Sequence, residues 1–517
     1  ILFNKESGQG GIDLTPPQPP APPQPVDTED QIAEFDGSAS EIEKWKAKNL
    51  RDNAGNYTFA EGATLRVKAS ANPLAIGDVA GNILFQDANG SIDMKGKKLT
   101  LEAAADSDAK RVGGIHLAGG SLDIKNAGAV DISIRGNKST SGAIYAAGSS
   151  TNEAQLTIAN GDTKDQAVKI RNTASGDKAA AITARKKGAN NGRVTIQGLA
   201  DIEQEGADLL HAAGGEIRIG GGRFIAKGDN AKAVTISKGG KVYINAQNDG
   251  DGVKAVSENR DVQMEGNVSL DIFGGTFGAA LTTKDSYIKG RIGMDIASGS
   301  TRLYLANGAR WENVSKGGAI EAFEGSHLTH LNAKNGHIFQ YDTKPLTIDR
   351  LSGSLNLYYK HVNDGAKTED YRDSGTPYGD THIKRAEANS SVTMVTDNSG
   401  VNTADENAVR KTLNALAGKL YYDGYKDNER NLKGTAMIAE GLTGSAVLQK
   451  LDLDYRESDG RARVKSNATS SEASGTIKKQ IAEGAYDDVE AVQEFWKKKG
   501  VYDGKGNYTF HHDIKLE

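Results

Sequence analysis

A repeated motif constrains the fold of this chain more than any other feature of the sequence. The motif is a glycine pair, a polar residue and then an apolar–polar–apolar run, and three clear copies lie at 119–124, 214–219 and 239–244. Alternation of apolar and polar residues indicates a strand with one buried face. Glycine supplies the left-handed or bridging backbone angles that a corner needs. The motif therefore predicts short strands separated by tight corners.

A second kind of strand, rich in small residues, lies a few residues before the glycine pairs. We treat five of its central residues as equivalent: Ile115, Ile144, Ile182, Leu210 and Val234. The steps between them are 29, 38, 28 and 24 residues. A period of about 20–40 residues with variable insertions is typical of a solenoid, in which each repeat packs only on its neighbours.

Among solenoids, strands this short favour a parallel β-helix, because stacking coils pairs the backbone groups that one hairpin leaves open. Glycine is abundant, at 62 of 517 residues, while aromatic residues make up only 6%. This composition therefore argues against a large globular core rich in aromatic residues. We predict an all-β chain that forms a right-handed parallel β-helix, with short helical segments at both ends.

The two ends differ from the repeat. Residues 15–26 read TPPQPPAPPQPV, which predicts a stiff polyproline II linker within 1–30. Residues 40–47 and 486–499 have the pattern of short helices. The segments around Trp45 and Trp496 match at nine of fifteen positions with an offset of 451. We interpret them as a duplicated helix-and-strand unit that covers exposed β-helix edges; paired lobes around a ligand are the alternative.

Cysteine, charge and hydropathy give weaker information. The chain has no cysteine, which means no disulfide framework and suits export through a pore in an unfolded state. The net charge of −5 is small for this length, so nothing global indicates a nucleic-acid partner. No apolar run approaches the 18 residues of a transmembrane helix.

From Trp311 onward the sequence resembles the pertactin-like C-terminal region of type Va autotransporter passengers. The resemblance rests on Trp311, on the stretches 326–331, 336–338 and 346–353, and on Gly379-Asp380, in that order. It implies a module that helps an exported passenger fold on the bacterial cell surface. It also implies export through an outer-membrane β-barrel, which we expect outside this sequence. The expected organisation is a Pro-rich linker at 1–30, a β-helix passenger at 31–300, a pertactin-like folding module at 301–400, and a β-helix extension with a helical cap or linker at 401–517.

The search for catalytic residues yields weak candidates only. Residues 372–375 read RDSG on a predicted loop, with His361 and His382 near in sequence, but a protease passenger needs a globular domain before the β-helix. Clustered carboxylates would indicate a polysaccharide-cleaving β-helix. Four acids occupy alternate strand positions and should point outward as a solvated face: Asp93, Asp123, Asp131 and Glu216. We predict no catalytic site.

Metal and cofactor sites are not expected. The densest acidic stretch, 248–252 (NDGDG), lacks the spacing and the closing glutamate of a calcium loop. We interpret it as a turn between strands. No other ligand spacing among the histidines or acids indicates a metal, and we predict no cofactor.

One basic cluster is the candidate binding site. It consists of Lys178, Arg185, Lys186 and Lys187, which flank the strand around Ile182. The step between coils is longest here, so a loop should protrude. A solvated insertion is one interpretation, and a contact site for an acidic glycan or protein is the other.

By elimination, the sequence predicts a surface for binding rather than a reaction centre. We expect a bacterial cell-surface adhesin that binds a host-cell or bacterial surface protein or glycan, or that associates with itself in biofilms, because a rod multiplies weak contacts. The alternatives are a polysaccharide-active or proteolytic β-helix enzyme and a passive rod that displays another domain. The fold alone does not decide among them.

Overall fold

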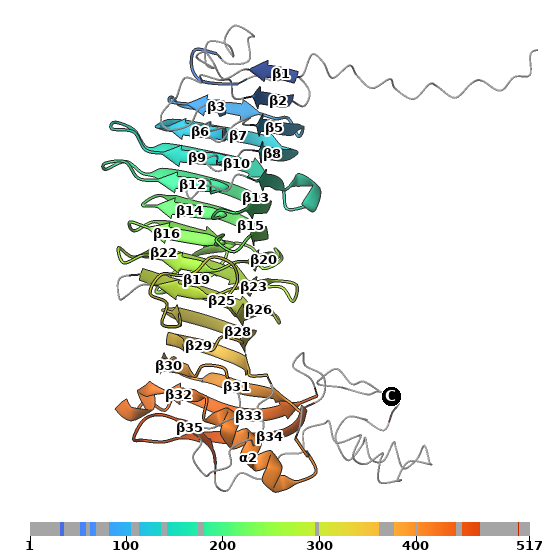
Figure 1. Ribbon diagram of the computed structural model, residues 1–517, viewed down its shortest axis with the longest axis vertical. Helices are drawn as coiled ribbons and strands as arrows, with labels where there is room; N and C mark the ends of the chain where they lie inside the picture. Colours follow the sequence, from blue (N-terminus) through green and yellow to red (C-terminus); the bar gives the residue numbers. More distant parts are fainter. Residues whose placement is uncertain are drawn as a thin grey trace, which may run out of the picture.

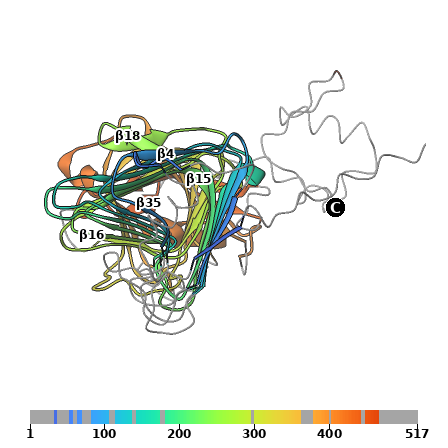
Figure 2. The same ribbon diagram turned by 90° about the horizontal axis from the view of Figure 1, so that it is seen from above.

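The computed structural model describes residues 32–35, 52–57, 63–68, 82–104, 113–135, 142–173, 180–294, 299–360, 377–398, 401–440, 447–465 and residue 505. Within these residues the chain is all-β apart from one α-helix and short 3-10 turns, and most strand pairs are parallel. The strands stack one above the next along a single long axis (Figure 1). Viewed along that axis, successive strands superpose around a common interior (Figure 2).

One sheet contains eight short strands, each of which pairs in parallel with the strand one coil away. From the N-terminal end they are β3 (Asn82–Gln86), β6 (Gly113–Ala118), β9 (Ile144–Ala147), β12 (Ile182–Arg185), β14 (Leu210–Ala213), β16 (Val234–Ser237), β21 (Val268–Leu270) and β24 (Ile292–Met294).

The predicted repeat register is confirmed in this sheet. Ile115 pairs with Ile144, and Ile144 pairs with Ile182. Ile182 pairs in turn with Leu210, and Leu210 with Val234. All five side chains are buried. Each residue lies one strand spacing, about 4.8 Å, from its equivalent. The stack is therefore unbroken even where the step along the chain is longest, the 38 residues between Ile144 and Ile182.

The second sheet contains 25 of the described strands. Its first part comprises β1 (Ile32–Phe35), β2 (Ala63–Lys68), β4 (Gly90–Asp93), β5 (Lys98–Ala104), β7 (Gly120–Ala127), β8 (Ala129–Arg135), β10 (Ala154–Asn160), β11 (Val168–Asn172), β13 (Gly192–Glu205), β15 (Glu216–Lys227), β17 (Lys241–Ile244), β20 (Val262–Glu265), β22 (Gly275–Leu281) and β23 (Tyr287–Lys289). Its remaining strands are β25 (Gly299–Ala306), β26 (Arg310–Asn313), β27 (Ser326–Leu328), β28 (His330–Gln340), β29 (Leu346–Tyr358), β30 (Thr381–Ala386), β31 (Ser390–Asp397), β32 (Leu420–Tyr422), β33 (Leu432–Ala439), β34 (Val447–Tyr455) and β35 (Ala462–Val464).

The two glycines of a pair meet different structural requirements at the corners. The first glycine of each predicted pair adopts a positive φ: 85° at Gly119 and 75° at Gly214 and Gly239. The second glycine lies against the neighbouring coil. A Cβ at Gly240 would lie 2.2 Å from the carbonyl oxygen of Ala212. In the pairs 214–215 and 239–240 the first position therefore needs glycine for its backbone angle, and the second for close stacking. At 119–120 the second glycine also has a positive φ, 79°.

The core is a set of apolar stacks that run along the axis. One stack follows the glycine motif through Leu122, Leu156, Val194, Ile217 and Val242, which pair in register from coil to coil. None of the five is measurably exposed. Small branched side chains fill the narrow interior, which is consistent with the low aromatic content of the sequence.

The parallel pattern ends near the C-terminal side of the described chain. Here β33 pairs antiparallel with β34, and β34 pairs antiparallel with β35. The helix α2 (Glu406–Ala417) packs beside these strands, with Asp405 as its N-cap and Leu413 and Leu416 fully buried. The prediction for 401–517 named an extension of the β-helix and placed helices only near the chain ends, so α2 and the antiparallel strands are additions to it.

Two predictions about the ends fall largely outside the described residues. The expected helices at 40–47 and 486–499 lie there, as does almost all of the segment around Trp496. The first copy of the duplicated unit is described at 52–57. Tyr57 is buried and forms a parallel bridge with Ile92, so this end of the first copy does lie against the stack.

One hairpin folds over the outside of the stack. The strands β18 (Ala246–Asp249) and β19 (Gly252–Ala255) pair antiparallel, and the stretch 248–252 forms their turn, as the sequence predicted. The hairpin buries Tyr243 and Tyr304 on the outward face of the larger sheet. No group of three or more side chains that could hold a metal occurs in the described part of the chain.

Candidate functional site

The predicted basic cluster is brought together at the turn after β12. Arg185 ends that strand, and Lys186 and Lys187 follow it, all three exposed. The amide of Lys187 donates to the carbonyl oxygen of Asn190 at 2.9 Å, and Asn190 returns a bond at 3.1 Å. The side-chain amide of Asn190 also donates to the carbonyl oxygen of Ser149 at 2.9 Å. The turn is therefore tied to the coil before it. Lys178 lies outside the described residues.

A fourth cation extends this cluster along the axis. Lys238 follows β16, two coils beyond β12, and is exposed. Gly214 occupies the coil between them, and a Cβ there would lie 2.8 Å from the Cβ of Lys186. Because Gly214 has no side chain, Lys186 has room to lie against the coil that contains Gly214. Backbone bonds fix the order: the Lys186 amide donates to Ala213 at 2.9 Å and the Gly214 amide to Ser237 at 2.8 Å. We call Arg185, Lys186, Lys187 and Lys238 the cationic ridge.

An apolar turn continues the ridge on the next coil. Ile272 and Phe273 are 56% and 68% exposed, more than any other large hydrophobic residue that the structure describes. Asp271 shapes the turn, because its carboxylate accepts from the Phe273 amide at 2.9 Å and from the Lys238 amide at 3.2 Å. The Gly239 amide donates to Gly274 at 3.2 Å. We call Ile272 and Phe273 the apolar tip. Figure 1 shows turns beside β9 and β12 projecting from the same stack.

The cations of the ridge lack carboxylate partners within the described residues: none of the four forms an ion pair there. The outward face of the larger sheet is different. Arg171 pairs with Asp201 at 2.5 Å, Arg223 pairs with Glu203, and Lys227 pairs with Glu203 at 2.7 Å. The hydrogen bond from Lys227, with help from Arg223, lowers the pKa of Glu203 to about 2. The ridge is thus a local excess of positive charge on a surface whose neighbouring charges compensate one another.

Sequence reasoning identified part of the ridge and missed the rest. Lys238 and Phe273 each precede a glycine pair, Gly239-Gly240 and Gly274-Gly275, and these pairs stack in register through Lys241 and Thr276. Ala213 holds the same place before Gly214-Gly215. The residue before a glycine pair therefore marks this corner on the coils that carry such a pair. Aligning the motif one position further toward the N-terminus would have found both residues.

The other candidates of the sequence are placed as follows. Asp93, Asp123, Asp131 and Glu216 face outward, as predicted, and Asp131 and Glu216 form ion pairs with Lys98 and Arg218 at 2.5 Å. The RDSG stretch and His361 lie outside the described residues. His382 stacks on Tyr421 with ring centroids 4.5 Å apart.

Comparisons with known proteins leave the chain without an assigned family. No family model matches it, and no curated protein or solved structure shows significant similarity to it. No helix among the described residues has the length and apolarity needed to cross a membrane.

Proposed function

We propose that the chain is a right-handed parallel β-helix and serves as an adhesin, the passenger of an autotransporter on a bacterial cell surface. The stacked parallel register supports the β-helix part of this proposal. Crossover connections between parallel strands are right-handed in nearly all proteins, which supports the handedness. The pertactin-like elements around Trp311 support the passenger part: Trp311 is fully buried and its indole N–H donates to the Gly290 carbonyl oxygen at 2.8 Å.

The observation that carries the adhesin proposal is the cationic ridge beside the apolar tip. Four exposed cations without ion pairs in the described chain attract acidic groups, because their charge is not compensated locally. Ile272 and Phe273 add apolar area that a partner buries on contact. The partner class is an acidic protein or glycan of a host or bacterial surface, and an acidic patch on a second copy of the chain belongs to the same class.

Binding fits the described carboxylates better than catalysis does. A glycoside hydrolase needs one carboxylic acid that stays protonated near neutral pH. On the outward face, Asp201 and Glu203 are held between cations, and the pKa of Glu203 falls to about 2. An ionised carboxylate such as that of Glu203 cannot donate a proton to a leaving group.

The test is binding of the purified full chain to immobilised heparin and to an acidic cell-surface protein fraction. Reversing Arg185, Lys186 and Lys187 to glutamate should weaken binding by roughly tenfold or more, because three favourable pairs become repulsive. Raising the salt concentration should weaken binding of the parent chain and leave the variant almost unchanged.

The matched control reverses three exposed lysines elsewhere on the stack, Lys97, Lys125 and Lys433, so that both variants have the same net charge. Equal losses in the two variants would mean that net charge, and not the ridge, governs binding. Release of products from a polysaccharide or peptide library by the parent chain would overturn the proposal in favour of an enzyme.

The apolar tip makes a separate prediction. Phe273→Ser should lower affinity several-fold and leave the salt dependence unchanged, because the tip contributes buried area and no charge. Val256→Ser is the control. Val256 is likewise an exposed apolar residue, 53% exposed, but it lies after the outer hairpin and away from the ridge. Identical affinities of the two variants would exclude the tip from the binding surface.

A further inference from the structure

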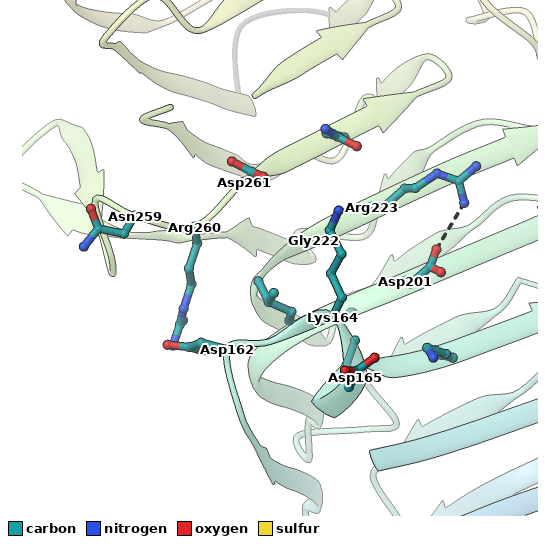
Figure 3. A pocket seen from close by; sticks show the side chains of 14 residues that line it. Asp162, Lys164, Asp165, Asp201, Gly222, Arg223, Asn259, Arg260 and Asp261 are labelled. Carbon is teal, nitrogen blue, oxygen red and sulfur yellow. Dashed lines mark hydrogen bonds and ion pairs between the residues drawn. The ribbon is translucent and has the colours of Figure 1, made fainter. Parts of the chain in front are cut away.

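A pocket on the outward face of the larger sheet is independent of the ridge. The 3-10 turn η2 (Lys164–Gln166) forms one wall, and the loop 259–261 forms the other. Strands β11, β13, β15 and β20 provide the floor between them (Figure 3). The cavity volume is about 410 Å³, within the range of small-ligand sites, about 300–1,000 Å³.

Arg260 joins the two walls. Its guanidinium donates to the carbonyl oxygens of Gln197 at 2.9 Å and Gly220 at 3.3 Å. It also pairs with Asp162 of the opposite wall at 2.7 Å, and only 15% of its side chain is exposed. Figure 3 shows Arg260 reaching across to Asp162. The pocket is therefore held open by contacts inside the protein, and binding does not have to form it.

The charged side chains of the pocket fall into two groups. Three acids are already engaged: Asp162 with Arg260, Asp201 with Arg223 and Arg171, and Asp261 with the Thr283 hydroxyl at 2.6 Å. Lys164 and Asp165 are exposed and Lys169 is half-buried, and within the described residues these three form no ion pair. The Thr283 hydroxyl is neutral, so Asp261 keeps its charge beside that of Asp165, and the lining as a whole carries four acids and four cations. Lys164 and Lys169 are the two ammoniums of the pocket that form no ion pair among the described residues, and they are available to an acidic group of a ligand.

The rest of the lining suits a sugar ring. Its floor is aliphatic and backbone, with Leu199 half-buried and Ala200 buried. Asn259, Asp165 and Gln263 stand around that floor as donors and acceptors, which hydroxyl groups can satisfy in both directions. A ligand with several hydroxyls and one carboxylate matches the polar rim and the two ammoniums of Lys164 and Lys169.

We propose that this pocket binds a carboxylate-bearing sugar, such as a uronic acid or sialic acid unit of a larger glycan. Lys164, which rises from the 3-10 turn (Figure 3), and Lys169 on β11 bind the carboxylate. Asp165 and Asn259 accept and donate hydrogen bonds to the hydroxyls. The sugar ring lies over Leu199 and Ala200.

The experiment is calorimetric titration of the full chain with trigalacturonate, with its uncharged methyl ester and with 3′-sialyllactose. At least one of the two acidic sugars should bind at millimolar or lower concentration. If trigalacturonate binds, its methyl ester should bind at least tenfold more weakly. The pair Lys164→Gln and Lys169→Gln should weaken acidic binding at least tenfold. Lys125→Gln, an exposed lysine on β7, should leave it unchanged.

Each other outcome contradicts the proposal. Absence of binding to both acidic sugars removes the site, and equal binding of the ester removes the role of the carboxylate. The glutamine pair should still bind the acidic cell-surface protein fraction through the ridge, which shows that the variant is folded and keeps this result separate from the test of the adhesin proposal.

Discussion

At the residue scale, the glycine pair makes the most specific prediction about folding. The two glycines differ in what an added Cβ meets. At Gly239 no atom lies within 4 Å and only the positive φ of 75° is unfavourable, whereas at Gly240 a backbone oxygen lies 2.2 Å away. We therefore expect Gly239→Ala to lower the free energy of unfolding by about 1–2 kcal/mol, the cost of a left-handed alanine.

Gly240→Ala should lower the free energy of unfolding more, by about 3 kcal/mol, because the neighbouring coil has to shift. Denaturant unfolding of both variants measures the difference. Gly239→Asn is the control and should be nearly neutral, since asparagine tolerates the left-handed region. A larger loss for Gly239→Ala than for Gly240→Ala contradicts the two roles assigned to the pair.

Glu203 gives a prediction about pH. Its pKa falls from 4.5 to about 2, chiefly because Lys227 donates a hydrogen bond to it. A lowered carboxyl pKa contributes stability above the unfolded value, and this contribution disappears as the pH falls from about 4.5 toward 2. The parent chain should be more stable than Glu203→Gln by roughly 0.5–1 kcal/mol at neutral pH, because the pair is near the surface.

The difference in the free energy of unfolding between the parent chain and Glu203→Gln should shrink toward zero near pH 2. Unfolding curves at pH 7, 4 and 2 follow it, with Glu205→Gln, an exposed glutamate on the same strand, as control. A gap between parent and Glu203→Gln that stays constant over this range would mean that the ion pairs do not act on stability.

At the element scale, the β18–β19 hairpin covers a histidine. A Cβ at Gly252 of the hairpin would lie 3.2 Å from the ring of His330 on β28. Burial lowers the pKa of His330, and the Arg350 and Arg302 charges lower it further, against the opposite effect of Glu387 and Asp251. The covered state therefore favours the neutral imidazole.

A histidine with a lowered pKa stabilises the folded state above its unfolded pKa, and this contribution is lost as the pH falls below 6.5. We expect the amides of 246–255 to exchange faster at pH 5 than at pH 7.5, after correction for intrinsic exchange rates. Hydrogen-exchange mass spectrometry measures this. His330→Gln should remove the pH dependence, and persistence of the dependence in that variant would assign it to another group.

The elements also show what sequence can predict. The register from Ile115 to Val234 was readable because buried residues recur once per coil and the corners carry glycine. Helix α2 was missed although Val409, Leu413 and Leu416 have helical spacing behind the Asp405 cap, because one short helix is a weak signal inside a long strand pattern. The pocket was not predicted, since Arg260 meets Asp162 only through folding, 98 residues apart.

At the scale of the whole molecule, the stack places residues far apart in sequence on common faces. The ridge and the apolar tip together draw on three turns between Arg185 and Phe273, and the pocket draws on strands from Val168 to Glu265. Neither surface exists in a single coil. Both depend on parallel coils that follow one another without a break, which is the central claim about this chain.

Spin labels test that claim most directly. The chain has no cysteine, so Gln155→Cys and Ser300→Cys introduce the only two labelling sites. These residues belong to one outward file, through the pairings 155–193, 193–216, 216–241, 241–276 and 276–300. Five coil steps at about 4.8 Å predict a narrow distance near 24 Å between positions 145 residues apart. A broad distribution, or a distance well beyond 35 Å, would contradict the parallel stack and with it both proposed binding surfaces.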